Sequence, residues 1–258
     1  MIIGGLQKLT LIDFPGKLAA TVFLVGCPFR CPWCYSSELV LPEKISKHPV
    51  ISEKDFFDFL EEKKGLLEGV VMCGGEPTIN NDLPDFAKKI KELGYAVKLD
   101  TNGTNPEMLK NLISENLVDY IAMDIKAPLT TKFQIPARNA SQASSLARVA
   151  VRAGKIQNYE RAVGVRVNLE KIKRSVDIVK NSGVDYEFRT TVTPTIHTKE
   201  DVIQIAKDIG PAKKYYLQNF RPEKTLDPAF EKIKPYSQEY LLDIVKVISP
   251  FFDVCRIR

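Results

Sequence analysis

Three cysteines lie within eight residues of one another, at Cys27, Cys31 and Cys34, with the spacing C-x3-C-x2-C. Clustered cysteines in a reducing compartment more often bind metal or carry out redox chemistry than form disulfides. The chain has five cysteines in all, an odd number, and its 258 residues exceed the usual length of a disulfide scaffold. The three-cysteine segment is therefore the first candidate for a functional site.

The choice of metal follows from the number of thiols. Three thiolates leave one iron of an iron–sulfur cluster open, whereas electron-transfer clusters are closed by four cysteines. An open metal position is where a substrate binds. A structural zinc site is the alternative, but it needs a fourth ligand. The two histidines, His48 and His197, are distant in the sequence, and Cys73 would have to reach the loop from another strand. We expect Cys73 and Cys255 to be buried apolar cysteines, and His197 to be a loop residue and not a catalyst.

The cysteine segment is predicted to be a loop. Positions i, i+4 and i+7 would share one face of a helix. Pro32 opposes a helix, because proline removes a backbone hydrogen bond and clashes with the preceding turn. The segment directly follows an apolar run at Thr21–Val25, so we expect a loop that leaves a buried strand. A loop of this kind can wrap around a cluster.

Six short apolar runs alternate with helical patterns, which predicts an α/β fold with a parallel sheet. Six strands are too few for a closed eight-fold barrel, so the prediction is a partial (β/α)6 barrel. Such a sheet places functional residues at the C-terminal ends of its strands. The expected strands are Thr21–Val25, Gly69–Met72, Ala96–Leu99, Tyr120–Ile125, Tyr186–Val192 and Lys214–Phe220. One expected helix begins after Ser52, its N-cap. The others span Leu83–Leu93, Pro106–Ile113, Thr198–Ile209 and Ser237–Ile248, and Ala140–Ala153 is a further candidate.

We predict one domain over residues 1–258. Residues 1–20 form an N-terminal hairpin that turns at Pro15-Gly16, residues 21–220 form the partial barrel, and residues 221–258 add a C-terminal helix and strand. No apolar run approaches the roughly 20 residues that span a bilayer, so no membrane contact is expected. The first residues do not resemble a signal peptide, and we therefore expect the protein in the cytoplasm.

Positive charge is concentrated between Lys132 and Lys180, where eleven Lys and Arg residues face three Asp and Glu residues. The local net charge is +8, although the whole chain carries +5. Such a region indicates either a surface for an acidic partner or a set of solvated helices.

Chemically distinctive residues lie on four of the expected strands or directly after them. Cys73-Gly74-Gly75-Glu76-Pro77 comes after the second strand, and adjacent glycines let a backbone approach a ligand closely. Asp100-Thr101-Asn102-Gly103 follows the third strand, and Met123-Asp124-Ile125-Lys126 follows the fourth. Arg189 lies on the fifth. The charged residues could bind polar groups of a ligand, directly or through a cation, or they could pair with one another.

The cysteine loop, with Trp33 before its last cysteine, resembles the signature of the radical S-adenosylmethionine superfamily, and the glycine segment is similar to the GGEP motif of that superfamily. The resemblance implies a 4Fe–4S cluster on Cys27, Cys31 and Cys34. It also implies that S-adenosylmethionine binds the open iron and is cleaved to a 5′-deoxyadenosyl radical. The resemblance and the residue types together assign to the S-adenosylmethionine site Trp33, Tyr35, Gly74, Gly75, Glu76, Pro77, Asp100, Asp124, Lys126 and Arg189.

Three further segments resemble activating enzymes of glycyl radical enzymes, in particular those of anaerobic ribonucleoside-triphosphate reductase. These are Leu9–Gly16, Glu187–Val192 and Tyr216–Phe220. The resemblance implies a glycyl radical enzyme as partner and a flavodoxin- or ferredoxin-type reductant. A radical enzyme that modifies RNA or a small molecule is the alternative, for which the basic region is the supporting feature. An iron–sulfur electron-transfer or zinc-binding module is the alternative of another class, and Gly74–Pro77 argues against it.

Overall fold

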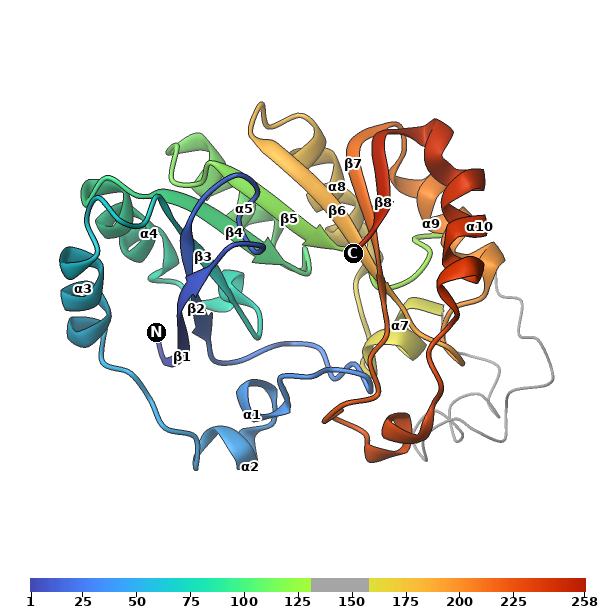
Figure 1. Cartoon of the computed structure of the whole chain (residues 1–258), viewed down its shortest axis with the longest axis horizontal. Helices are drawn as coiled ribbons and strands as arrows, with labels where there is room; N and C mark the ends of the chain where they lie inside the picture. The colour runs from blue at the N-terminus through green and yellow to red at the C-terminus, as the bar shows by residue number, and fades with distance from the viewer. Residues whose placement is uncertain (131–157) are drawn as a thin grey trace. The chain divides into compact units, whose positions relative to one another are not determined.

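The computed structural model of the chain describes residues 1–130 and 158–258 (Figure 1). It divides into two compact units. The first consists of Met1–Pro28, Ser36–Met123 and Arg174–Tyr186, and the second of Phe29–Tyr35, Asp124–Lys173 and Glu187–Arg258. The expected helix at Ala140–Ala153 and much of the basic region lie outside the described residues. The single domain expected over residues 1–258 stays a prediction.

The first unit is built on strands that neighbour one another in chain order. They are β1 (Ile3–Thr10), β2 (Ala19–Leu24), β3 (Gly69–Gly74), β4 (Ala96–Thr101) and β5 (Tyr120–Asp124), the last of which ends at the boundary between the units. The hairpin of β1 and β2 is antiparallel, whereas β2, β3, β4 and β5 pair in parallel. The first four predicted strands are therefore confirmed. A hairpin is present at the N-terminal end, but its second arm is β2, the first predicted barrel strand, and not a segment within residues 1–20.

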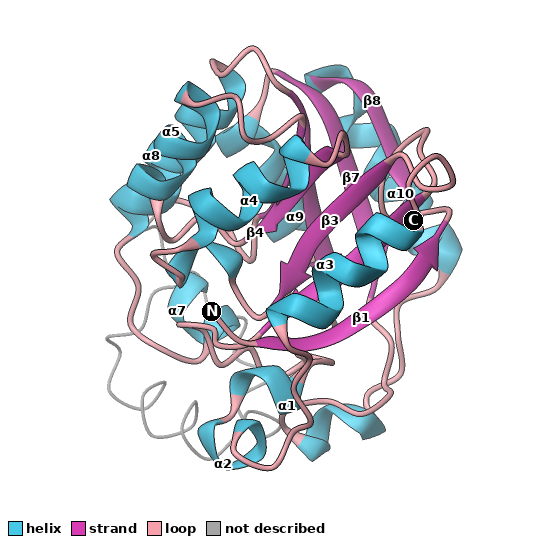
Figure 2. Cartoon of the chain, turned by 90° about the vertical axis from the view of Figure 1, so that its left-hand side faces the viewer, coloured by secondary structure: helices cyan, strands magenta, loops and turns pink. Residues whose placement is uncertain are grey.

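Helices connect the parallel strands of the first unit, and α3 and α4 cover one face of its sheet (Figure 2). Ser52 caps α3 by accepting a hydrogen bond from the backbone N–H of Asp55, as the sequence predicts. Phe56 of α3 stacks on Phe86 of α4 with ring centroids 5.2 Å apart, which joins the two helices over the core. The helices of this unit are α1 (Ser37–Val40), α2 (Pro42–Ile45), α3 (Glu53–Glu62), α4 (Leu83–Glu92), α5 (Pro106–Ser114) and the 3-10 turn η1 (Pro77–Ile79).

The turn between β1 and β2 supplies a side chain that closes the apolar core of the first unit. Phe14 is buried and packs with Ala19, Val71 and Tyr120. Thr10 accepts hydrogen bonds from two backbone N–H groups of the turn, and Thr21 donates to Asp13. The segment Leu9–Gly16 therefore anchors the sheet, which gives this sequence motif a structural role.

The second unit contains most of β6 (Asp185–Val192), which begins at the unit boundary, with β7 (Ala212–Asn219) and β8 (Phe252–Ile257). These strands pair in parallel and in chain order. A complete capping box begins α9, where Thr198 and Asp201 exchange side-chain-to-backbone hydrogen bonds. The expected C-terminal helix and strand are confirmed as α10 and β8. The helices that remain are α7 (Asn158–Val163), α8 (Leu169–Lys180, which crosses the unit boundary), α9 (Lys199–Ile209), α10 (Gln238–Ile248) and the 3-10 turns η2 (Pro228–Lys232) and η3 (Ser249–Phe251).

Together these elements confirm the predicted α/β class, with a sheet in which parallel pairing dominates. Sequence analysis missed α8, although its buried residues Leu169, Ile172, Val176 and Val179 recur at helical spacing and could have revealed it. Among the described residues, every helix is too short or too polar to cross a membrane.

A buried ion pair joins β6 to the residue after β8. The carboxylate of Glu187 is fully buried and accepts two hydrogen bonds from the Arg258 guanidinium, at 2.7 and 3.0 Å. The guanidinium carbon of Arg258 also lies 3.6 Å from the ring centroid of Tyr216 on β7. One side chain therefore holds the three strands of the second unit together.

We predict that Arg258→Ala destabilises the protein by about 3 kcal/mol, because it leaves the buried Glu187 carboxylate without its cation. Arg256→Ala, at an exposed position on β8 two residues earlier, is the control and should change stability by less than about 0.5 kcal/mol. Urea unfolding of the two variants measures both effects. Equal stabilities would contradict a structural role for the ion pair.

Candidate active site

The cysteine loop leaves β2 and is held at its start by backbone hydrogen bonds within the first unit. Gly26 donates its N–H to the carbonyl of Leu39 at 2.8 Å, and its own carbonyl accepts the N–H of Glu76 at 2.7 Å. The side-chain amide of Asn102 donates to the sulfur of Cys27 at 3.7 Å. Sequence analysis quoted Asn102 within a strand-end segment but did not include it among the site residues. Its position directly after a predicted strand end was the available signal.

The remainder of the loop belongs to the second unit and forms no regular helix, as Pro32 predicts. The N–H of Cys34 donates to the carbonyl of Cys31 at 3.0 Å, which closes a tight turn between the two cysteines. The carbonyls of Pro32 and Cys34 accept from the backbone of Asp227 and Leu226, both at 2.9 Å. Cys31 is buried and Cys34 is half-buried. The segment after β7 therefore fixes this half of the loop.

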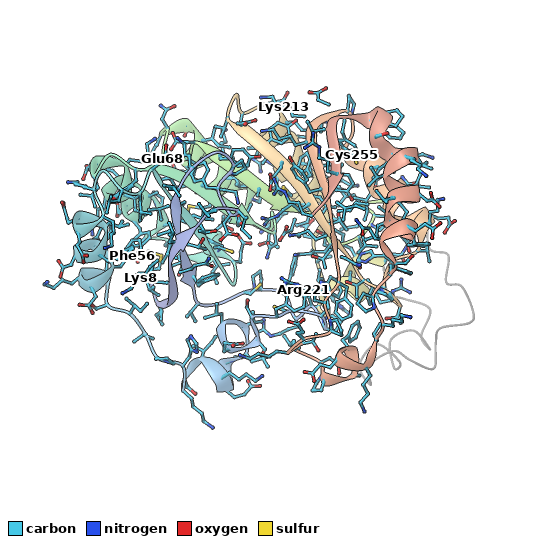
Figure 3. The ribbon with its side chains drawn as sticks, in the orientation of Figure 1. Lys8, Phe56, Glu68, Lys213, Arg221 and Cys255 are labelled. Carbon is cyan, nitrogen blue, oxygen red and sulfur yellow. The ribbon has the colours of Figure 1, made fainter. Side chains whose placement is uncertain are left out.

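Both predicted aromatic residues of the loop are packed against other rings. Trp33 is buried and meets the ring of His197 edge-on at 5.8 Å. Tyr35 stacks on Phe220 at 6.5 Å, and its hydroxyl accepts from the backbone N–H of Arg221, the residue labelled near the loop in Figure 3. Burial raises the pKa of Tyr35, so its hydroxyl stays protonated. These contacts fix the orientations of the Trp33 and Tyr35 rings.

The glycine pair at the end of β3 is required by the chain's own backbone. Gly74 has φ of +119°, and a Cβ there would lie 2.3 Å from the backbone nitrogen of Leu24. A Cβ on Gly75 would lie 2.0 Å from the carbonyl oxygen of Gly26. Sequence analysis attributed these glycines to close approach of a ligand. The structure shows that they also let β3 follow β2 into the start of the cysteine loop.

The buried side chain of Glu76 links the ends of β3 and β4 by hydrogen bonds. Its carboxylate accepts hydrogen bonds from the backbone N–H and hydroxyl of Thr78, from the hydroxyl of Thr101 and from the N–H of Asn102, at 2.5 to 3.2 Å. Burial raises the pKa of Glu76, although these donors act in the opposite direction. The side chain holds Asn102 in place, and through it the contact to Cys27.

Asp124, Lys126 and Arg189 form one charged cluster in the second unit. Arg189 donates to one carboxylate oxygen of Asp124 at 2.8 Å, and the Lys126 ammonium donates to the other at 3.1 Å. Burial acts to raise the pKa of Asp124, but the two cations outweigh it and lower the pKa to about 2. Burial acts to lower the pKa of Lys126, whereas the charges of Asp124 and the Cys31 thiolate raise it. Lys126 therefore stays charged near Cys31.

His197 lies in a loop, as the sequence predicts, and its buried ring links two segments of the second unit. Its Nδ1 accepts the N–H of Thr193 at 3.0 Å, so its Nε2 carries the proton and donates to the carbonyl of Lys126 at 2.8 Å. Burial lowers the pKa of His197 to about 4, which keeps the ring neutral. No sequence motif indicated this role. The residue fixes the backbone at Lys126 and one side of Trp33.

The other predicted residues have simpler surroundings. Asp100 bonds to the buried ammonium of Lys98, two residues earlier on β4. Cys73 is half-buried and packs against the apolar cluster around Phe14. Cys255, labelled on β8 in Figure 3, is half-buried, and burial raises the pKa of its thiol to about 11. Both cysteines are thus less buried than the sequence predicts.

The chemistry of the residues fits the predicted cofactors. Cys27 has a side-chain amide donor at its sulfur, and Cys31 is buried near a lysine, and both features favour thiolates that bind iron. Within residues 1–130 and 158–258, no three His, Cys, Asp or Glu side chains are grouped so as to hold a single metal ion. The candidate residues form two sets, with Cys27, Gly74–Pro77 and Asp100 on the first unit and the others on the second.

Similar proteins were found by sequence and by structure. A candidate glycyl-radical enzyme activating enzyme of Methanocaldococcus jannaschii is 29% identical over 264 residues, which cover 100% of this chain and 95% of the relative. A 7-carboxy-7-deazaguanine synthase of Thermococcus kodakarensis is 27% identical over 128 residues, which cover 43% of this chain and 50% of that protein.

Among solved structures, SuiB of Streptococcus suis bound to S-adenosylmethionine superposes with a TM-score of 0.60 at 15% identity and covers 92% of this chain. This chain spans about half of SuiB, 51% of its length, and the likeness concerns the fold. Residues 21–209 match the radical SAM superfamily, whose members use a 4Fe–4S cluster and S-adenosylmethionine. The protein described here belongs to the radical SAM superfamily and is a radical SAM enzyme.

Proposed function

We propose that this enzyme generates a glycyl radical on a partner protein, and that the partner is an anaerobic ribonucleoside-triphosphate reductase. The observation that carries the proposal is the similarity to the candidate activating enzyme of M. jannaschii, which extends over the whole chain. The choice of reductase rests on the resemblance of Leu9–Gly16, Glu187–Val192 and Tyr216–Phe220 to activating enzymes of that class.

Cys27, Cys31 and Cys34 are the proposed ligands of the cluster, and the fourth iron stays open for S-adenosylmethionine. When bound, the reduced cluster supplies one electron to the sulfonium, and the carbon–sulfur bond breaks to give methionine and a 5′-deoxyadenosyl radical. The protein orients these groups and excludes water. A flavodoxin- or ferredoxin-type protein is the proposed source of the electron, and a reducing cytoplasm is the proposed setting because it keeps the thiols available for iron.

The charged cluster in the second unit is proposed to bind S-adenosylmethionine. Asp124 bonds to Arg189 and Lys126 through separate oxygens, so it fixes the direction of both cations. The Lys126 ammonium has three donors, of which Asp124 uses one, and an ammonium of this kind suits a carboxylate ligand. Trp33 and Tyr35 are the proposed neighbours of the adenosyl group, and Asp100 and Gly74–Pro77 the proposed contacts on the first unit.

The proposed reaction on the partner transfers one hydrogen atom. The 5′-deoxyadenosyl radical takes the Cα hydrogen of a glycine, which leaves 5′-deoxyadenosine and a glycyl radical. The partner must present this glycine on a loop, because the hydrogen has to come within van der Waals reach of the radical. The basic residues of the Lys132–Lys180 region are the proposed contact for an acidic partner.

A small-molecule radical reaction is the second candidate function. The specific observation in its favour is the similarity of part of the chain to 7-carboxy-7-deazaguanine synthase. That relative matches less than half of this chain, whereas the M. jannaschii protein matches all of it. Activation of a glycyl radical enzyme is therefore the better supported function.

The first prediction concerns the cluster. Anaerobically reconstituted protein should hold about four irons and four sulfides per chain. Changing Cys27, Cys31 or Cys34 to Ala should abolish the intact cluster, whereas Cys73→Ala and Cys255→Ala should keep it. Iron and sulfide analysis of the five variants is the measurement. Loss of iron in Cys73→Ala, or one tightly bound zinc per wild-type chain, would contradict the three-cysteine site.

The second prediction concerns the charged cluster. Lys126→Met should weaken S-adenosylmethionine binding about tenfold or more, since it removes a charge-assisted hydrogen bond, while the iron content stays near that of the wild type. Lys173→Met is the matched control, because Lys173 forms an exposed ion pair with Glu170 in the same unit. Equilibrium dialysis of the reconstituted proteins measures the affinity. Equal affinities of the two variants would remove Lys126 from the binding site.

The third prediction tests the partner. The reduced enzyme, S-adenosylmethionine and the anaerobic reductase of the same organism should yield the doublet EPR signal of a glycyl radical and one 5′-deoxyadenosine per radical formed. A reductase whose radical glycine is replaced by alanine serves as the control and should give no doublet. If the reductase gives no signal but the enzyme turns over a small molecule with S-adenosylmethionine, the second candidate function is correct.

A further inference from the structure

The short helix α7, which the sequence analysis did not predict, contacts the cysteine loop directly. The backbone N–H of Arg30 donates to the carbonyl of Val163, the last residue of α7, at 2.8 Å. The next residue, Gly164, has φ of +72°, and a Cβ placed there would lie only 2.4 Å from the carbonyl oxygen of Arg30. The backbone after α7 therefore lies against the backbone between Phe29 and Cys31, with no space for a side chain.

The same helix places a buried tyrosine beside the loop. Tyr159 is fully buried and meets the ring of Phe29 edge-on, with centroids 6.4 Å apart. Its hydroxyl accepts the backbone N–H of Lys126 at 3.3 Å. Tyr159 thus connects the cysteine loop to the end of β5.

A second side chain of α7 extends these contacts to the loop that carries His197. Arg161 donates to the carbonyl of Ile196 at 2.6 Å, and His197 in turn donates to the carbonyl of Lys126. Backbone groups of Arg30, Lys126 and Ile196 are therefore all bonded to a helix of six residues or to its side chains. An isolated helix of that length is not stable in water, so its order depends on these contacts.

We infer that residues Asn158–Gly164, which we term the 158–164 brace, are a positioning element for the iron–sulfur cluster. The brace fixes the path of the loop into Cys31 and sets the surroundings of that sulfur. The inference rests on the proposed role of Cys31 as an iron ligand. It gives a function to a segment for which the family resemblance provides none.

A brace of this kind has a consequence beyond stability. The reduction potential of a cluster depends on the hydrogen bonds to its sulfurs and on their exposure to solvent. The brace acts next to Cys31, because it bonds the backbone of Arg30, the preceding residue, and packs Tyr159 against Phe29, two residues before it. A change in the brace should therefore shift the midpoint potential, which a change in general stability does not do.

The test uses two glycines with the same backbone conformation. Gly164 and Gly183 have φ of +72° and +75°, so alanine causes similar backbone strain at both. A Cβ at Gly183 meets nothing within 4 Å, whereas one at Gly164 meets the Arg30 carbonyl. Full-length Gly164→Ala and Gly183→Ala are reconstituted anaerobically. Iron content and the midpoint potential, from an EPR-monitored redox titration, are then measured for each.

We expect Gly164→Ala to lose at least half of the iron that the wild type binds, and its remaining cluster to have a shifted potential, while Gly183→Ala matches the wild type in both. Tyr159→Phe keeps the buried ring and removes only the hydroxyl, so it should keep its iron and still shift the potential. If the two alanine variants behave alike and Tyr159→Phe has the wild-type potential, the brace is only a structural element and the inference is wrong. If the wild type itself binds no cluster, the proposed function fails with it.

Discussion

The site depends on one constraint, which is that the cysteine loop cannot hold its own shape. Two prolines within Cys27–Cys34 exclude a helix, and a backbone hydrogen bond from Cys34 to Cys31 closes a turn inside the loop. Other backbone bonds tie the loop to distant segments. Within the first unit they go to Leu39 and Glu76, and within the second to Val163, Leu226 and Asp227. Segments far apart in the sequence must therefore fold correctly before this loop can adopt its path.

The polar residues around the loop follow the same principle. The buried carboxylate of Glu76 is committed to four protein donors, and that of Asp124 to two cations. Each carboxylate acts mainly on its neighbours: Glu76 places Asn102 beside Cys27, and Asp124 directs Lys126 and Arg189. Groups fixed in advance lose little freedom when a ligand binds, which favours tight binding at the S-adenosylmethionine site that we propose. The neutral His197 adds to this by holding the backbone of Lys126.

Much of this arrangement could be predicted from the sequence, because it is encoded locally. Runs of β-branched residues marked the strands, and Ser52 and Thr198 marked helix starts through capping bonds that the structure contains. The cysteine spacing identified the loop, and Pro32 its irregular shape. These signals need only a few neighbouring residues. The parallel order of the strands follows from their alternation with helices.

The parts that sequence reasoning missed are contacts over long separations. Nothing near His197 shows that its ring bonds to Lys126, 71 residues earlier. Tyr159 and Gly164 lie in a segment without a motif, and their role depends on a loop more than 120 positions away in the chain. The glycines of Gly74-Gly75 were predicted to approach a ligand, although the backbone of Leu24 and Gly26 alone requires them. Such roles become visible only when the fold brings the partners together.

We propose that three cysteines hold a cluster whose open iron binds S-adenosylmethionine. EPR spectroscopy of the reduced, reconstituted protein, with spectra recorded before and after addition of S-adenosylmethionine, is the decisive test. We expect the signal of a reduced 4Fe–4S cluster that changes shape when S-adenosylmethionine is added, since a new ligand on one iron alters the cluster. A cluster signal that S-adenosylmethionine leaves unchanged, in protein with its full iron content, would contradict it.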